Sequence, residues 1–120
     1  MSAQLDRLRG SIPPLVTPFS NGEVDYDTYA RLVAFQIKNG SHGILVNGTT
    51  AEPSTLSVEE RNRLVDVAVQ VAAGKVPVVA ATGSQSLRET RELTEHAAKA
   101  GVDALLIVTP YYIQIGRAHV

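Results

Sequence analysis

The sequence predicts an α/β fold, the N-terminal half of a (β/α)8 TIM barrel with about four βα units. Short apolar runs begin near residues 12, 43, 76 and 104 and alternate with segments of helical periodicity, a spacing of about 30 residues per unit. The runs are continuously apolar, as in parallel strands covered on both faces. A complete barrel needs roughly 250 residues, so we expect 120 residues to hold about half of one. A four-stranded doubly wound sheet is the alternative, but no G-x-G-x-x-G turn follows the first run.

The first predicted unit is a strand at residues 11–19 and a helix that begins at Asp25. The strand is apolar and interrupted by prolines, and a turn at residues 20–22 follows it. Tyr29, Val33 and Ile37 recur at helical spacing, and Gly40 ends the helix.

The second predicted unit is a strand at residues 43–46, a polar loop at 47–56 and a helix. Ser57 and Glu60 have the spacing of a capping box, in which the serine hydroxyl and the glutamate carboxylate satisfy two free N–H groups at the start of the helix. Leu64 and Ala68 then fall on one face, and Gly74 ends the helix.

The last two units repeat this pattern. A strand at residues 76–81 leads to Ser86 and Glu89, which predict a second capping box, and Gly101 ends the helix. A fourth strand follows at residues 104–108. Because a half barrel cannot close, we expect its outer strand edges to be unpaired and the chain alone to aggregate or fold incompletely.

The composition restricts the class of protein. Hydrophobic residues make up 44%, charged residues 19%, and the net charge is -1, so no basic surface for nucleic acid or an anionic membrane is expected. Cysteine is absent, and the first ten residues carry charges where a signal peptide needs an apolar run, which predicts a cytoplasmic protein. His42, His96 and His119 lack metal-ligand spacing, so we expect no metal and no other cofactor.

Barrel enzymes carry their chemistry on the loops after the strands, here residues 47–56, 82–85 and 109 onward. In the first loop Gly48 precedes Thr49 and Thr50, and two hydroxyls beside backbone N–H groups can hold a carboxylate or a phosphate. The alternative is that both hydroxyls bond their own loop backbone. Ser84 and Gln85 either line the pocket or cap the next helix.

Three strings, GSIPPLVTPF (10–19), GTTAEPSTLS (48–57) and VTPYY (108–112), resemble the dihydrodipicolinate synthase and N-acetylneuraminate lyase family. The resemblance implies a class I aldolase that binds pyruvate or another 2-oxo acid as a Schiff base on a lysine. Thr50 would then receive the substrate carboxylate beside Gly48, and Thr49 would relay protons with Tyr112. In this family that tyrosine enters a neighbouring subunit's site, so we expect a homo-oligomer, a tetramer or a dimer. Ala51 stands where the family commonly has glycine.

The Schiff-base lysine is absent from this chain. Such a lysine must point into the barrel near the carboxyl end of a strand, where its amine is desolvated. The three lysines are Lys38 and Lys99 at helix ends and Lys75 before a strand, and the family's lysine is on strand six. We therefore expect the chain alone to be inactive.

The parent protein is interpreted as the family's synthase of the lysine and diaminopimelate pathway, which condenses pyruvate with aspartate semialdehyde. The alternatives are another 2-oxo-acid aldolase or dehydratase of the family, such as a sialic-acid or sugar-acid lyase, and a non-catalytic carboxylate-binding barrel. We take residues 1–113 as the partial barrel domain. The end of the chain, IGRAHV, matches the translation of a sequencing adaptor, so residues 114–120 are hypothesised to be non-native.

Overall fold

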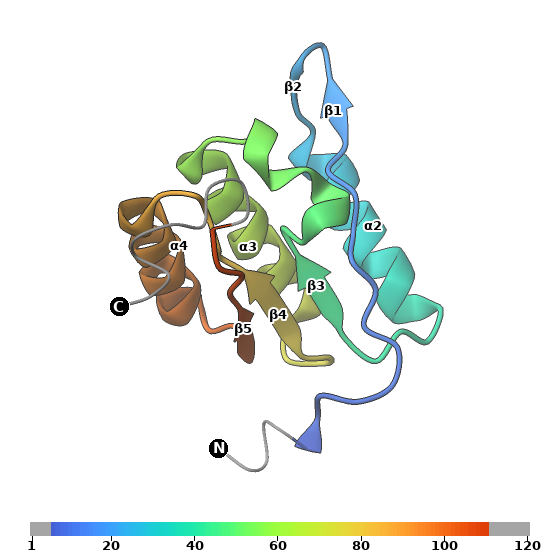
Figure 1. Cartoon of the computed structure of the whole chain (residues 1–120). Coiled ribbons are helices and arrows are strands. Elements are labelled where there is room, and N and C mark those ends of the chain that lie inside the picture. Colours follow the sequence, from blue (N-terminus) through green and yellow to red (C-terminus); the bar gives the residue numbers. More distant parts are fainter. Residues whose placement is uncertain (1–5, 111–120) are drawn as a thin grey trace.

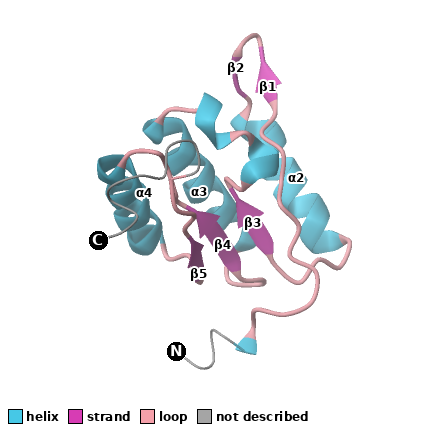
Figure 2. Ribbon diagram, viewed as in Figure 1, coloured by secondary structure: helices cyan, strands magenta, loops and turns pink. Residues whose placement is uncertain are grey.

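The computed structural model describes residues 6–110 of the chain. Within that range, a parallel sheet lies in front of a layer of helices (Figure 1). The strands are β3 (Ile44–Val46), β4 (Val78–Ala81) and β5 (Ala104–Leu106), paired in that order. The helices are α2 (Tyr26–Lys38), α3 (Val58–Ala72) and α4 (Leu87–Ala100), and Figure 2 shows all of them on one side of the sheet. The predicted alternation of strands and helices is confirmed.

The predicted strand at residues 11–19 is not a regular strand. Pro14 pairs with Leu45 as an isolated parallel bridge, and the Leu45 N–H donates to the Pro13 carbonyl over 3.1 Å. The segment therefore runs beside β3 as a first barrel strand would. Proline has no N–H, so successive prolines prevent a continuous ladder. The end of the segment instead forms a hairpin, β1 (Phe19–Ser20) with β2 (Glu23–Val24), around the predicted turn.

The predicted helix starts are correct, with one difference in how α4 begins. Asp25 caps α2, and Ser57 and Glu60 form both bonds of a capping box on α3. Ser86 caps α4, but its own N–H donates to Ser84 Oγ over 3.3 Å, and Ser84 Oγ donates to the Glu89 carboxylate over 2.9 Å. The second capping box is thus only half formed, because the Ser84 hydroxyl takes the place of the direct bond between the Ser86 N–H and the Glu89 carboxylate.

The core lies between the helices and one face of the sheet. Alternate strand residues, Ile44 and Val46 on β3 and Val78 and Ala80 on β4, are at most 3% exposed. They pack with Leu64, Val65 and Ala68 of α3 in one cluster. The opposite sheet face carries Leu45 and Val79, which are half-buried. In a closed barrel this second face would line the interior.

Candidate functional site

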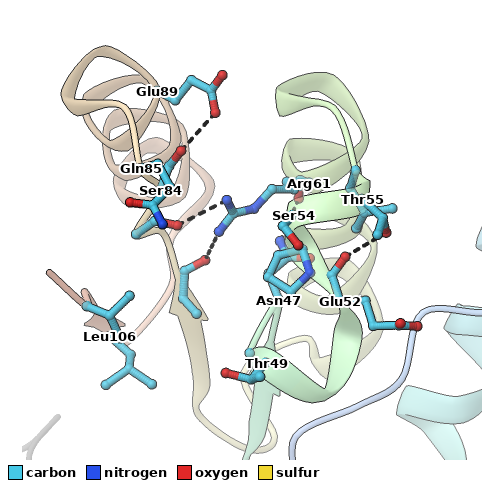
Figure 3. A pocket seen from close by; sticks show the side chains of 16 residues that line it. Asn47, Thr49, Glu52, Ser54, Thr55, Arg61, Ser84, Gln85, Glu89 and Leu106 are labelled. Carbon is cyan, nitrogen blue, oxygen red and sulfur yellow. Dashed lines mark hydrogen bonds between the residues drawn. The ribbon is translucent and has the colours of Figure 1, made fainter. Parts of the chain in front are cut away.

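A cavity of about 750 Å³ lies at the carboxyl ends of β3, β4 and β5. Its lining includes Gly48, Thr49, Arg61, Ser84, Gln85 and Leu106 (Figure 3). The residues after β3 and after β4 thus meet, as the parallel topology predicts, because the carboxyl ends of parallel strands lie at the same edge of a sheet. Two of the three predicted loops, at residues 47–56 and 82–85, therefore contribute to one pocket.

The threonine pair forms the short 3-10 helix η1 (Thr49–Ala51), and its two members have different surroundings. Both are exposed, but Thr49 lines the cavity and Thr50 is not part of the lining. Among the described residues, neither hydroxyl has a hydrogen-bond partner. The loop carbonyls of Ala51 and Glu52 are bonded by other hydroxyls, from Thr17 and Thr55. Both hydroxyls of the pair therefore remain able to bind a ligand.

Gly48 has little space for a side chain, but its backbone conformation is an ordinary one. Its φ of -69° is open to any residue, but an added Cβ would lie 3.0 Å from Leu45 Cδ2. The left-handed residues of this loop are Asn47, with φ of 62°, and Glu52, with φ of 54°. Ala51, which stands where the family commonly has glycine, sits in η1 and needs no left-handed conformation. The residue change is therefore compatible with this loop.

Two buried polar residues, Asn47 and Arg61, were not identified from the sequence. Asn47 is 2% exposed and its Nδ2 donates to the Arg61 carbonyl over 3.0 Å. The Arg61 guanidinium is in turn hydrogen-bonded to Ala81 O at 2.9 Å and Gly83 O at 3.1 Å. A signal was present, because Arg61 lies three and seven positions before Leu64 and Ala68 and so falls on the buried helix face.

The loop after β4 combines both roles considered for it. Ser84 and Gln85 line the cavity. The Ser84 N–H also donates to Thr90 Oγ1 over 3.0 Å, which ties the loop to the first turn of α4. A pocket wall and a helix cap are therefore formed by the same short segment.

The lysines lie where the sequence predicted. Lys38 is the last residue of α2, Lys99 is in the last turn of α4, and Lys75 precedes β4 at the end of the sheet opposite the cavity. None of these three described lysines lines the pocket.

The described residues hold no cluster of metal ligands. His96 Nε2 instead lies 2.7 Å from Asp66 Oδ1, joining α4 to α3. Tyr111, Tyr112, His119 and the proposed tail at 114–120 lie outside the described residues.

Two tyrosines of α2 are perturbed, away from the cavity. Burial raises the pKa of the Tyr29 phenol far above its ordinary value, and its hydroxyl is buried without a hydrogen-bond partner in the described part of the chain. Burial and, to a smaller extent, the Glu60 carboxylate raise the pKa of Tyr26. Both phenols stay neutral at ordinary pH and serve packing.

Parallel strands alternating with helices, with a cavity at the strand carboxyl ends, define part of a (β/α)8 barrel. Dihydrodipicolinate synthase from Aquifex aeolicus superposes with a TM-score of 0.84 at 46% identity, over 88% of this chain and 36% of that one. A prophage protein of the dihydrodipicolinic acid synthase family from E. coli K12, solved with pyruvate, gives 0.87 at 36% identity, over 93% and 38%.

The dihydrodipicolinate synthetase family matches residues 7–119, and the chain belongs to this family. It is 53% identical over 105 residues to 4-hydroxy-tetrahydrodipicolinate synthase of Cereibacter sphaeroides, covering 88% of this chain and 36% of the relative. The enzyme of the same name from Thermus thermophilus is 47% identical over 106 residues, with the same coverage. The chain thus spans about a third of the length of these relatives. Within residues 6–110, no helix has the length and apolar character needed to cross a membrane.

Proposed function

We propose that this chain is part of a 4-hydroxy-tetrahydrodipicolinate synthase that condenses pyruvate with aspartate semialdehyde in the cytoplasm. Two observations together support the proposal. Relatives of that name are 52–53% identical to this chain over the aligned residues, and the hydroxyls of the threonine pair lie at or beside the cavity without a hydrogen-bond partner among the described residues. In the first step a lysine outside this chain attacks the pyruvate keto carbon. The keto oxygen leaves as water, and an imine forms between carbon and nitrogen.

The residues of this chain would bind and orient the keto acid. The Thr50 hydroxyl and N–H would donate to the pyruvate carboxylate, next to the small residue Gly48. Thr49, whose hydroxyl faces the cavity, would pass protons to and from Tyr112 of a neighbouring subunit. This arrangement requires a homo-oligomer, because one relay residue comes from another copy.

A second candidate is another 2-oxo-acid aldolase of the same family. It is favoured by the high TM-score of 0.87 with the E. coli prophage protein, which was solved with pyruvate. A third, a barrel that only binds a carboxylate, would lack the lysine on strand six. The second substrate separates the two enzymes, and the lysine separates both of them from the binding protein.

The first test uses an extended protein, expressed from this coding sequence together with the downstream part of the same gene. The extended protein is treated with pyruvate and borohydride, and intact mass reports a reduced adduct on one lysine. Turnover with aspartate semialdehyde then identifies the synthase, whereas an adduct without that turnover favours another aldolase. A protein that binds pyruvate but forms no adduct would contradict the enzyme proposal. The 120-residue chain alone is expected to form no adduct.

The two threonines are separated by kinetics in the same protein. Thr50→Val should raise KM for pyruvate by about 10- to 100-fold, since it removes a hydrogen bond to a charged group. Thr49→Val should lower kcat by about 100-fold or more, since it interrupts proton transfer. Ser41→Ala, at the opposite end of the sheet, is the control and should change neither constant. An unchanged KM in Thr50→Val would contradict the assigned carboxylate contact.

A further inference from the structure

A chain of hydrogen bonds joins the two loops that form the cavity. It begins at Asn47, the residue between β3 and Gly48, whose Nδ2 donates to the Arg61 carbonyl over 3.0 Å. It continues through the Arg61 side chain, which donates to the carbonyls of Ala81 at 2.9 Å and Gly83 at 3.1 Å. Helix α3 is therefore bonded to the carboxyl ends of β3 and β4 by one residue, Arg61, through both its backbone and its side chain (Figure 3).

Both residues of this hydrogen-bond chain, Asn47 and Arg61, are buried, so water cannot easily take the place of their partners. Arg61 is 5% exposed and Asn47 is 2% exposed. A buried guanidinium is stable only where its donors are satisfied, and its planar fork suits two carbonyls at once. Asn47 also holds a left-handed backbone, with φ of 62°, which sets the direction in which Gly48 and Thr49 leave the strand.

We propose that Arg61 and Asn47 form a bracket that positions Thr49 against the loop at residues 83–85. Neither residue acts on the substrate. The Asn47 amide fixes where η1 starts, and the Arg61 fork fixes how far the loop after β4 stands from it. Together they set the width of the cavity between these two loops. This inference rests on the proposed function, because Thr49 is the group positioned.

The test measures turnover per active site in the extended protein. Borohydride trapping of pyruvate counts the sites, and kcat is divided by that count, so that unfolded protein does not enter the rate. Arg61→Ala should lower kcat per site by about 10- to 100-fold, since a small misplacement of a relay group costs that much. Added ethylguanidinium should restore part of the rate, whereas Arg61→Lys, without the planar fork, should remain slow.

Arg63→Ala is the matched control. Arg63 lies on the same helix, where its guanidinium sits 4.0 Å from the Tyr26 ring centroid, and this variant should retain the wild-type rate. Asn47→Gly separates backbone from side chain, because glycine accepts the left-handed φ but has no amide. The proposal predicts a lower kcat per trapped site for Asn47→Gly than for the wild type. Normal kcat per trapped site in both Arg61→Ala and Asn47→Gly would overturn the proposal.

A measurement that needs no enzyme activity distinguishes failure of the proposed function from failure of the bracket proposal. If wild-type protein traps no pyruvate, amide hydrogen exchange at residues 48–51 and 83–85 decides the bracket. Faster exchange in Arg61→Lys and Asn47→Gly than in Arg63→Ala supports it. Equal exchange in all three variants overturns it, and Arg61→Lys serves where Arg61→Ala does not fold.

Discussion

Gly83 and Gly48 both follow strands at the cavity, and each is glycine because of what an added methyl group would contact. At Gly83 a Cβ would meet the backbone of Val108, with its N at 2.9 Å and its O at 3.0 Å. At Gly48 its tightest contact would be with the tip of the Leu45 side chain, at 3.0 Å. The backbone two residues after β5 moves aside less readily than a leucine side chain, which can change rotamer. The first glycine is therefore the less replaceable of the two.

We expect Gly83→Ala to reduce the free energy of unfolding by about 1–3 kcal/mol, as overpacking does elsewhere. Gly48→Ala, the matched variant on the neighbouring loop, should cost less because Leu45 can move. Urea unfolding of the two variants and the wild type measures the difference. A larger loss in Gly48→Ala than in Gly83→Ala would show that the loop after β3 is the more rigid.

Helix α2 illustrates how local rules determine an element. The Asp25 carboxylate accepts the Thr28 N–H over 3.0 Å and its hydroxyl over 2.7 Å. The backbone bond from Thr28, then its hydroxyl and the nearby Arg31 charge, lower the pKa of Asp25 below its ordinary value. A lowered carboxyl pKa means that the cap stabilises the folded chain above the unfolded pKa of about 3.9 and that this stability disappears as the pH falls through the folded pKa.

Asp25→Asn should remove this pH dependence while keeping a capping side chain. The gap in thermal midpoint between wild type and Asp25→Asn should shrink as the pH falls below about 4, since the wild-type carboxylate becomes protonated. Asp27→Asn, in the first turn of the same helix, is the control for a lost surface charge. A gap that stays constant down to the lowest measurable pH would contradict the assigned cap.

At the scale of the whole molecule, the sheet ends at an incompletely covered strand. Leu105 pairs with the buried Ala80 and shares its side of the sheet, yet it is 40% exposed. Leu106, on the opposite side, is 46% exposed. In the described residues β5 is the last strand of the order, so one edge of its backbone is unpaired. An apolar strand with a free edge is a site for pairing with another chain.

We expect the chain to self-associate through β5 as its concentration rises. Leu105→Lys should reduce this association, because a charged side chain on an edge strand opposes pairing. Phe35→Lys is the control, since Phe35 is 58% exposed on α2 but belongs to no sheet edge. Sedimentation velocity over a concentration series measures the effect. A wild-type chain that stays monomeric throughout would contradict the expectation.

The sequence by itself determined the order of elements, the helix starts and the two loops that line the cavity. These follow from rules that act within a few residues, namely the hydroxyl and carboxylate caps, the apolar periodicity and the missing N–H of proline. Even the departure from a regular first strand has its cause in adjacent prolines, Pro13 and Pro14. The roles of Thr50 and Tyr112 rest on family resemblance and stay predictions.

Only the tertiary structure decided which side chains meet at the cavity. Thr49 and Thr50 are adjacent in sequence, yet just one of them lines the pocket, because the turn of η1 separates their side chains. Arg61 reaches carbonyls 20 and 22 positions away along the chain, a contact that requires α3 and β4 to be packed together first. Contacts of this kind depend on the relative placement of whole elements, and local sequence patterns carry no record of that placement.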